Sequence, residues 1–230
     1  MSNLPYLERH HQDPNLWIYY GREYNGMPIV WQRGPYIYNY LQRIDKTIQG
    51  ALNDHTTIMA VRVDLRLPSQ LDWMTQPVGR PIFSRFIDSL KAKIEARKNK
   101  TERGGSRFHS TTVHFVWARE FGEQGKPHYH CVLFFNKQSF KSLGEYNPQS
   151  NSLYSMIDNA WHSALGLEIG LADGLVCIPG RKDSYSPIYL IRRGEDYSEL
   201  FRRVSYFAKL PTKRFGLNSH NFGTSRTPCS

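Results

Sequence analysis

Two histidines, His128 and His130, flank a tyrosine in a segment that is typical of a β-strand, HYHCVLFF (128–135). Side chains alternate along a strand, so both imidazoles should point to one face of the sheet and Tyr129 to the other. Two imidazoles about 7 Å apart along one strand can chelate a divalent ion if a neighbouring strand adds a third ligand. A lone His-x-His pair is more often incidental than a metal site. A metal site is therefore expected only if a flanking segment supplies a third ligand.

The segment that precedes the histidines could supply the third ligand. STTVHFVWARE (110–120) is a second predicted strand, and the short loop FGEQGK predicts an antiparallel hairpin. If the hairpin is symmetric about Gln124, Glu120 faces His128 on the same surface, with Cβ atoms roughly 5 Å apart. This mixed nitrogen and oxygen set suits Mn²⁺ or Mg²⁺ and is also compatible with zinc. A register slip of one residue would turn Glu120 away and make Glu123 the substitute ligand.

A second candidate group lies on a predicted helix over residues 195–210, EDYSELFRRVSYFAKL. Tyr206 falls about 180° from the apolar stripe of this helix, and Lys209 follows one turn later. Tyr206 is therefore not placed as a core residue, which makes it either a surface tyrosine or a functional one. Its closest rival, Tyr197, falls inside the apolar stripe and is better explained as core.

These two segments resemble the motifs of HUH-type replication initiators. In that family, Pro-His-hydrophobic-His follows an acidic residue eight positions before the first histidine, as Glu120 precedes His128 here. SYFAK (205–209) resembles the third motif of the family, Tyr-x-x-Lys, and follows the histidines in the order of the family. The stretch 119–135 is also very similar to one in geminivirus Rep proteins. The pattern over 40–210 resembles inovirus replication proteins and related prophage proteins, although the first motif is matched only loosely.

The resemblance implies a metal-dependent, sequence-specific endonuclease that nicks and joins single-stranded DNA to start rolling-circle replication of a phage, prophage or plasmid. Tyr206 would be the single nucleophilic tyrosine, which becomes joined to the DNA 5′ end and leaves a free 3′ hydroxyl. Lys209 would stabilise the phenolate or the charge that develops on the phosphate. Glu120, His128 and His130 would bind the Mn²⁺ or Mg²⁺ ion.

Two other functional classes remain open. The first is an HUH transposase or relaxase, although relaxases usually carry a third histidine downstream and the residues after His130 are CVLFFN. The second is a non-catalytic DNA-binding descendant, such as a prophage regulator. This second class is disfavoured because the candidate catalytic residues are all present, namely Glu120, His128, His130, Tyr206 and Lys209.

The chain is strongly basic, with a formal charge of +10 and a pI of about 9.6. Such a field attracts polyanions, and the resemblance implies that the partner is single-stranded DNA at a replication origin. Arg62, Arg66 and Arg202 are the candidate DNA contacts. No G-x-x-x-x-G-K-Ser/Thr phosphate loop is present, so a host or separate helicase must open the duplex. The resemblance also implies a host polymerase that extends the primer.

Cysteine usage favours a reducing cytoplasm, and the resemblance to phage and prophage proteins implies that of a bacterial host. The three cysteines are odd in number and form no CxxC pair, so neither a disulfide framework nor a cysteine zinc site is expected. We expect no membrane partner, because no apolar run approaches 18 residues and the first residues do not form a secretory signal.

The hydrophobic patterns predict an α+β fold. Helices are expected over 36–53, 81–99, 152–166 and 195–210, and strands over 58–68, 110–120, 128–135 and 174–180. The resemblance implies a central antiparallel sheet of about five strands, the RRM-like palm of HUH endonucleases, with helices on one face and the metal site on the other. We divide the chain into an N-terminal extension (1–35), the endonuclease domain (36–210) and a loosely ordered basic tail (211–230).

Overall fold

The computed structural model describes residues 7–68, 81–122, 125–168, 174–180, 187–215 and 220–226. Its helices are α1 (Tyr38–Asp54), α2 (Ile82–Arg103), α3 (Leu153–Leu165) and α4 (Ser198–Ser205), with 3-10 turns η1 (Trp31–Arg33) and η2 (Tyr206–Ala208). Its strands are β1 (Leu7–Arg9), β2 (Trp17–Tyr19), β3 (Glu23–Tyr24), β4 (Met27–Pro28), β5 (Tyr36–Ile37), β6 (Thr57–Arg66), β7 (His114–Phe121), β8 (Pro127–Asn136), β9 (Val176–Cys177), β10 (Ile188–Arg192) and β11 (Phe222–Thr224). None of these helices is long and apolar enough to span a membrane.

One antiparallel sheet forms the centre of the molecule, with strand order β10-β6-β8-β7-β11 and with β9 paired to the end of β6. The predicted α+β class with a central antiparallel sheet is confirmed, with six strands where about five were expected. The sequence did not predict β10 or β11. In β10 the side chains are half-buried or exposed throughout, so this strand has no clear alternation of apolar and polar residues.

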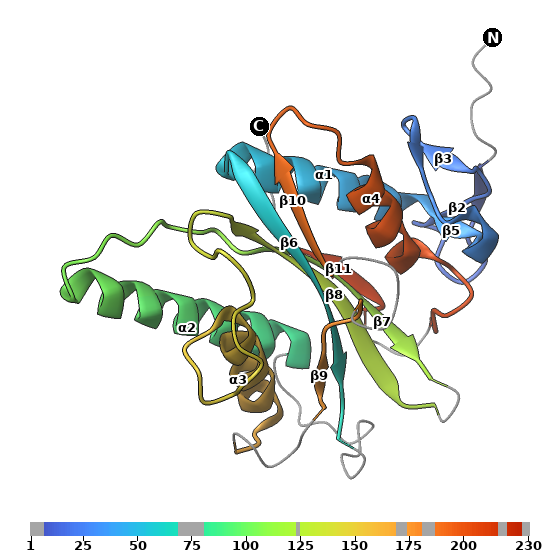
Figure 1. Ribbon diagram of the computed structural model, residues 1–230. Helices are drawn as coiled ribbons and strands as arrows, with labels where there is room; N and C mark the ends of the chain where they lie inside the picture. Colours follow the sequence, from blue (N-terminus) through green and yellow to red (C-terminus); the bar gives the residue numbers. More distant parts are fainter. Residues whose placement is uncertain are drawn as a thin grey trace.

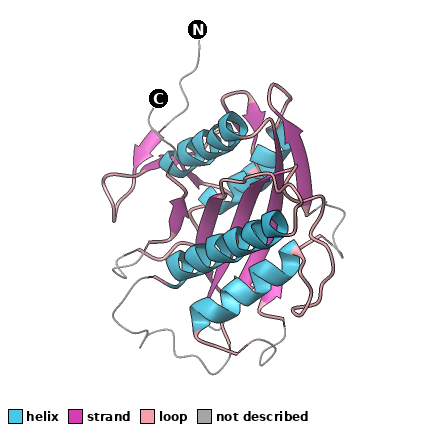
Figure 2. Ribbon diagram, turned by 90° about the vertical axis from the view of Figure 1, so that its left-hand side faces the viewer, coloured by secondary structure: helices cyan, strands magenta, loops and turns pink. Residues whose placement is uncertain are grey.

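Helices cover both faces of the sheet, so the prediction of helices on one face only is wrong. Helices α2 and α3 pack on one face, whereas α1 and α4 pack on the other (Figure 1). Figure 2 views the sheet from the side of α2 and α3, which cross in front of its strands. The cause is visible in β6, where four successive residues, 58–61, are fully buried and therefore place apolar side chains on both faces. A helix layer on each side removes these side chains from water.

In the C-terminal half of β6, residues 62–66, buried side chains alternate with more exposed ones. Val63 and Leu65 remain fully buried against α2 and α3, whereas Arg62, Asp64 and Arg66 are partly or largely exposed on the other face. Helices α1 and α4 therefore cover only part of their face. Polar side chains of the central strands occupy the remainder, and the candidate site lies there.

The ends of α3 follow the local sequence. The side chain of Ser152 accepts a hydrogen bond from the backbone N–H of Ser155, at 3.0 Å, and so caps the first turn. Gly166 ends the helix with φ of 72°, the left-handed conformation that glycine adopts without a steric penalty. The predicted stop at Gly166 is therefore confirmed, and α2 runs to Arg103, beyond its predicted end at Asn99.

The N-terminal segment has its own small sheets, β1-β2-β5 and the hairpin β3-β4, which the sequence did not predict. It is tied to α4, since the ring of Tyr24 stacks on that of Phe201 at 5.4 Å. The tail differs from the loosely ordered segment that we predicted, because β11 pairs with the edge of β7. The ring of Phe222 is 4% exposed and stacks on that of Tyr40 at 4.2 Å.

Phe222→Ala should lower the free energy of unfolding by about 3 kcal/mol, because it empties a buried aromatic position between β11 and α1. Chemical denaturation monitored by circular dichroism measures the loss. Leu190→Ala is the control, since Leu190 is 52% exposed and its truncation should cost less than about 1 kcal/mol. Equal losses in the two variants would mean that the tail does not pack as described.

Candidate active site

The three central strands bring the predicted metal ligands together. Glu120 of β7 pairs with His128 of β8, in the register that symmetry about Gln124 predicts. On the other side of β8, Arg66 pairs with His128 and Asp64 pairs with His130. Glu123, the alternative ligand for a slipped register, lies outside the described residues.

The side chains alternate across β8 as expected. Tyr129 points to the opposite face from the histidines, where it is buried with its ring 5.8 Å from that of Trp161. The two imidazoles share the face of Glu120. Packing of Tyr129 against α2 and α3 therefore fixes which face the histidines occupy.

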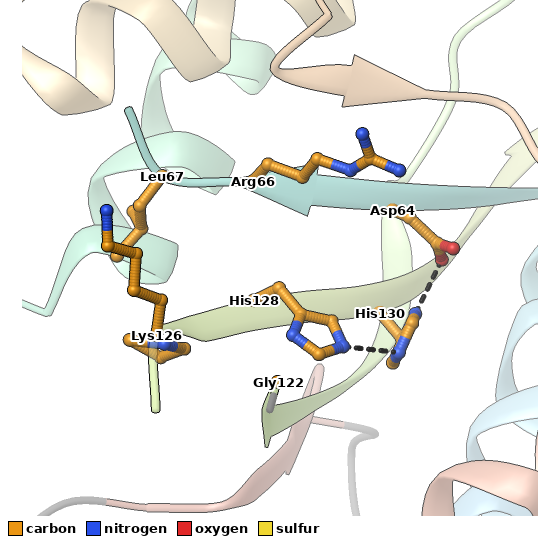
Figure 3. Close-up of a pocket in the computed structure, with 8 residues that line it drawn as sticks. Asp64, Arg66, Leu67, Gly122, Lys126, His128 and His130 are labelled. Atoms are coloured by element: carbon orange, nitrogen blue, oxygen red, sulfur yellow. Dashed lines mark hydrogen bonds and ion pairs between the residues drawn. The ribbon is translucent and has the colours of Figure 1, made fainter. Parts of the chain in front are cut away.

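The ligand atoms of Glu120, His128 and His130 converge within 4.8 Å of one another. The two histidine Nε2 atoms are 3.1 Å apart, and Nε2 of His130 is 3.5 Å from Oε2 of Glu120 (Figure 3 shows the histidines). Two atoms that ligate one ion at right angles, each about 2.1 Å from it, are about 3 Å apart. The separations and the donor types therefore fit a divalent metal.

A carboxylate behind His130 fixes the direction of its ring. Nδ1 of His130 lies 2.7 Å from Oδ1 of Asp64, which leaves Nε2 to face the other ligands. Burial lowers the pKa of His130, but its hydrogen bonds with Asp64 and Glu120 outweigh burial and raise the pKa above the usual value. A positive charge is therefore favoured between these carboxylates. Burial, and then the charge of His130, lower the pKa of His128, which favours its neutral, metal-binding form.

Glu120 is 4% exposed and has two lysine partners besides His130. Nζ of Lys209 is 3.0 Å from its Oε2, and Nζ of Lys213 is 3.3 Å from its Oε1. Burial opposes ionisation, but His130 and the lysines hold the pKa of Glu120 far below its usual range. Burial also lowers the pKa of Lys213 to about 8, against the attraction of Glu120. An ionised carboxylate accepts about four hydrogen bonds, so it can keep both lysines and still serve as a ligand.

Tyr206 reaches this cluster through Lys209. The predicted helix tightens after Ser205 into the 3-10 turn η2, in which side chains at i and i+3 eclipse. Nζ of Lys209 consequently lies 3.6 Å from the centre of the Tyr206 ring and donates a hydrogen bond to its hydroxyl. The backbone of Lys209 is held by a β-bridge to Tyr36. A continuous chain of contacts thus joins Tyr206, Lys209, Glu120 and the histidine pair.

Two cavities open at this cluster, and Asp64 and His130 line both. The tyrosine-side cavity, of about 360 Å³, is lined by Val30, Arg33, Arg62, Pro179, Arg202, Arg203 and Tyr206. The histidine-side cavity, of about 560 Å³, is lined by Arg66, Leu67, Gly122, Lys126, Pro127 and His128 (Figure 3). The three arginines predicted to contact DNA all line these cavities, although Arg202 is also paired with Glu199, at 2.9 Å.

The rival tyrosine, Tyr197, faces α1 instead. Its hydroxyl donates to Oδ1 of Asp45 at 2.7 Å and accepts from Gln49 at 3.2 Å. Burial, and then Asp45, against the Gln49 hydrogen bond, raise the pKa of Tyr197 to about 12. These hydrogen bonds tie Tyr197 to α1, and none of its described partners is a histidine of the site.

A family model described as the YagK/YfjJ C-terminal domain matches residues 21–225. The chain belongs to the YagK/YfjJ family. The uncharacterized protein YfjJ of Escherichia coli (strain K12) is 38% identical over 207 residues, which cover 84% of this chain and 96% of YfjJ. The uncharacterized protein YagK of the same organism is 34% identical over 198 residues, 84% of this chain and 95% of YagK. No solved structure matches the chain.

Sequence reasoning missed three residues of this YagK/YfjJ-family site. Asp64 lies on the polar face of a predicted strand, but only the pairing of β6 with β8 reveals that it contacts His130. Lys213 lies in the segment that we predicted as a loosely ordered basic tail, and no local pattern places it beside Glu120. Arg33 belongs to the segment that we treated as an extension, yet it lines the tyrosine-side cavity.

Replacing both histidines, as His128→Ala plus His130→Ala, should abolish tight binding of one Mn²⁺ ion per chain. The variant removes two of three ligands from a partly exposed site, so the protein should remain folded by circular dichroism. Isothermal titration calorimetry with MnCl₂ measures the affinity.

His11→Ala is the control for this experiment, because the side chain of His11 is 85% exposed and lies outside the cluster. It should bind Mn²⁺ as the unmodified protein does. Unchanged Mn²⁺ affinity in the double variant would remove the metal from this hairpin.

Proposed function

We propose that this YagK/YfjJ-family protein is a metal-dependent HUH-type endonuclease that nicks and rejoins single-stranded DNA through a phosphotyrosine at Tyr206. The observation that carries the proposal is the contact of Lys209 with both the Tyr206 hydroxyl and Glu120. This lysine connects the Tyr-x-x-Lys segment to the histidine hairpin, which is distant in the sequence. An endonuclease of this type needs both segments at one phosphate.

The proposed reaction exchanges one phosphate ester for another. The hydroxyl oxygen of Tyr206 attacks the phosphorus of a phosphodiester, so a Tyr–O–P bond forms while the bond from phosphorus to the 3′ oxygen breaks. The phenolic proton passes to water, and the departing 3′ oxygen takes up a proton to become a free hydroxyl. No oxidant or energy source is required, and the reverse reaction rejoins the strand.

The side chains of the site have distinct roles in this reaction. The ammonium group of Lys209 stabilises negative charge on the Tyr206 oxygen as it loses its proton. Asp64 holds His130 in the orientation that directs Nε2 toward Glu120 and His128. A Mn²⁺ or Mg²⁺ ion held by these three ligands would supply polarisation of the scissile phosphate.

We further propose that the nick starts rolling-circle replication of a phage, prophage or plasmid in a bacterial cytoplasm. The free 3′ hydroxyl would prime a host polymerase, and a host helicase would unwind the duplex. The intact chain of contacts from Tyr206 to His130 favours an enzyme over a DNA-binding protein that has lost catalysis.

Tyr206→Phe should abolish formation of the covalent adduct while it leaves Mn²⁺ and DNA binding within about twofold of the unmodified protein. The substitution removes one half-buried oxygen and keeps the ring. The protein is incubated with Mn²⁺ and a pool of random-sequence single-stranded oligonucleotides, and is then digested. Mass spectrometry identifies the peptide that carries a nucleotide.

Tyr197→Phe is the matched control, since it makes the same change at a tyrosine bonded to Asp45 rather than to Lys209. It should form the adduct as the unmodified protein does, with some loss of stability. Full nicking by Tyr206→Phe, or a nucleotide found on another tyrosine, would refute the assignment of the nucleophile.

The affinity for single-stranded DNA should fall steeply with salt, because the charge of +10 and the arginine-lined cavities predict contacts with phosphates. For about four such contacts, raising NaCl from 50 to 200 mM should weaken binding by roughly 50-fold. Fluorescence anisotropy with a labelled oligonucleotide measures this dependence. An affinity that is flat over this range would contradict a phosphate-binding role for the basic surface.

A further inference from the structure

The two cavities differ in their relation to the nucleophile. Tyr206 lines the tyrosine-side cavity and is absent from the lining of the histidine-side cavity, whereas His130 and Asp64 line both. His128 lies between Lys126 and His130 in Figure 3, so the histidine-side cavity extends away from His130 along the end of β8. The ligand cluster therefore stands between two basic cavities with the tyrosine on one side.

The in-line geometry of phosphoryl transfer predicts which cavity holds which side of the cut DNA strand. The attacking and leaving oxygens lie roughly in line, on opposite sides of the phosphorus. A phosphate held at the histidines and attacked by Tyr206 must direct its leaving oxygen away from the tyrosine-side cavity. In the proposed reaction the leaving oxygen is the 3′ oxygen of the DNA on the 5′ side of the cut.

We propose that the histidine-side cavity binds the DNA on the 5′ side of the cut, and that the tyrosine-side cavity binds the DNA on the 3′ side. This inference rests on the proposed function and adds the polarity of the bound strand. The strand would cross the ends of β6 and β8, from Arg66 and Lys126, past the histidines, to Tyr206 and Arg33. After cleavage the free 3′ end would stay in the histidine-side cavity. The strand joined to Tyr206 would stay in the tyrosine-side cavity.

The histidine-side cavity suits a nucleotide. Arg66 is exposed directly beside its strand partner His128, and the exposed Lys126 adds a second positive charge. Leu67 and Pro127 supply an apolar wall against which a base can pack. The volume of about 560 Å³ lies within the range of small-ligand sites, roughly 300–1,000 Å³.

In the part of the chain that the structure describes, four arginines from three segments line the tyrosine-side cavity: Arg33 from η1, Arg62 from β6, and Arg202 and Arg203 from α4. Among the described residues of the lining, these four arginines face a single carboxylate, Asp64, so this part of the cavity favours phosphates. Beside Arg33 in the chain, Trp31 is 48% exposed, with the guanidinium of Arg22 4.7 Å from its ring centre. An exposed indole next to phosphate-binding arginines offers a base a surface for stacking. The N-terminal segment thus becomes part of the DNA site.

The test compares two exposed arginines, one from each cavity. The cut position is first mapped with the unmodified protein and the random oligonucleotide pool. Binding is then measured in a Tyr206→Phe background, which keeps the DNA intact, with three oligonucleotides: one complete, one lacking nucleotides 5′ of the cut and one lacking those 3′ of it. Arg66→Ala and Arg33→Ala are each added to this background. Arg103→Ala removes an exposed charge at the end of α2 as the control.

We expect Arg66→Ala to weaken binding of the complete oligonucleotide by roughly tenfold, and to have little effect once the 5′ nucleotides are missing. Arg33→Ala should show the same dependence on the 3′ nucleotides. A reversed pattern would overturn the polarity. The control Arg103→Ala should change the affinity equally for all three oligonucleotides. The same uniform effect in Arg66→Ala and Arg33→Ala would overturn the division between cavities. The absence of any adduct on Tyr206 in the mapping step would instead refute the proposed function, and this inference with it.

Discussion

The buried carboxylate of Glu120 is the group on which the candidate site depends. A carboxylate that is 4% exposed is strongly destabilising unless cations replace its lost hydration. Here the partners are His130 on β8 and two lysines, Lys209 and Lys213, from the chain after α4. Removing one partner of a buried ion pair typically costs about 3–5 kcal/mol, so this requirement keeps the C-terminal segment against the sheet. The same contacts place Tyr206 within reach of the histidines.

The register of the three central strands satisfies the fold and the site together. On one face, Val63, Leu65, Cys131 and Tyr129 pack under α2 and α3, and on the other Asp64, His128, His130 and Glu120 meet. Because side chains alternate, a slip of one residue would bury the charged groups under the helices and expose the apolar ones. Core packing therefore holds the ligands in register, even though the ligands themselves form a polar cluster. The open part of the α1 and α4 face leaves room for a substrate.

Both ends of the chain contribute to the site. The N-terminal segment provides Arg33 and the strand β5, whose Tyr36 forms a bridge with Lys209, and the backbone N–H of Leu210 donates to the carbonyl of Pro35 at 2.8 Å. The C-terminal segment provides Lys213 and closes the sheet with β11. The match of the YagK/YfjJ model to residues 21–225 includes both of these contributions. Segments that look peripheral in the sequence thus position the residues around Tyr206.

The sequence by itself determined the features that depend on local periodicity. Alternation placed His128 and His130 opposite Tyr129, the short loop set Glu120 against His128, and Gly166 ended α3. These features follow from the period of a strand or the reach of a tight turn, which act over a few residues. Only the tertiary structure decided that helices cover both faces, that Asp64 supports His130, and that Lys213 pairs with Glu120. Such contacts join segments far apart in the chain, and the burial of apolar surface and charge over the whole molecule selects them, which no local pattern records.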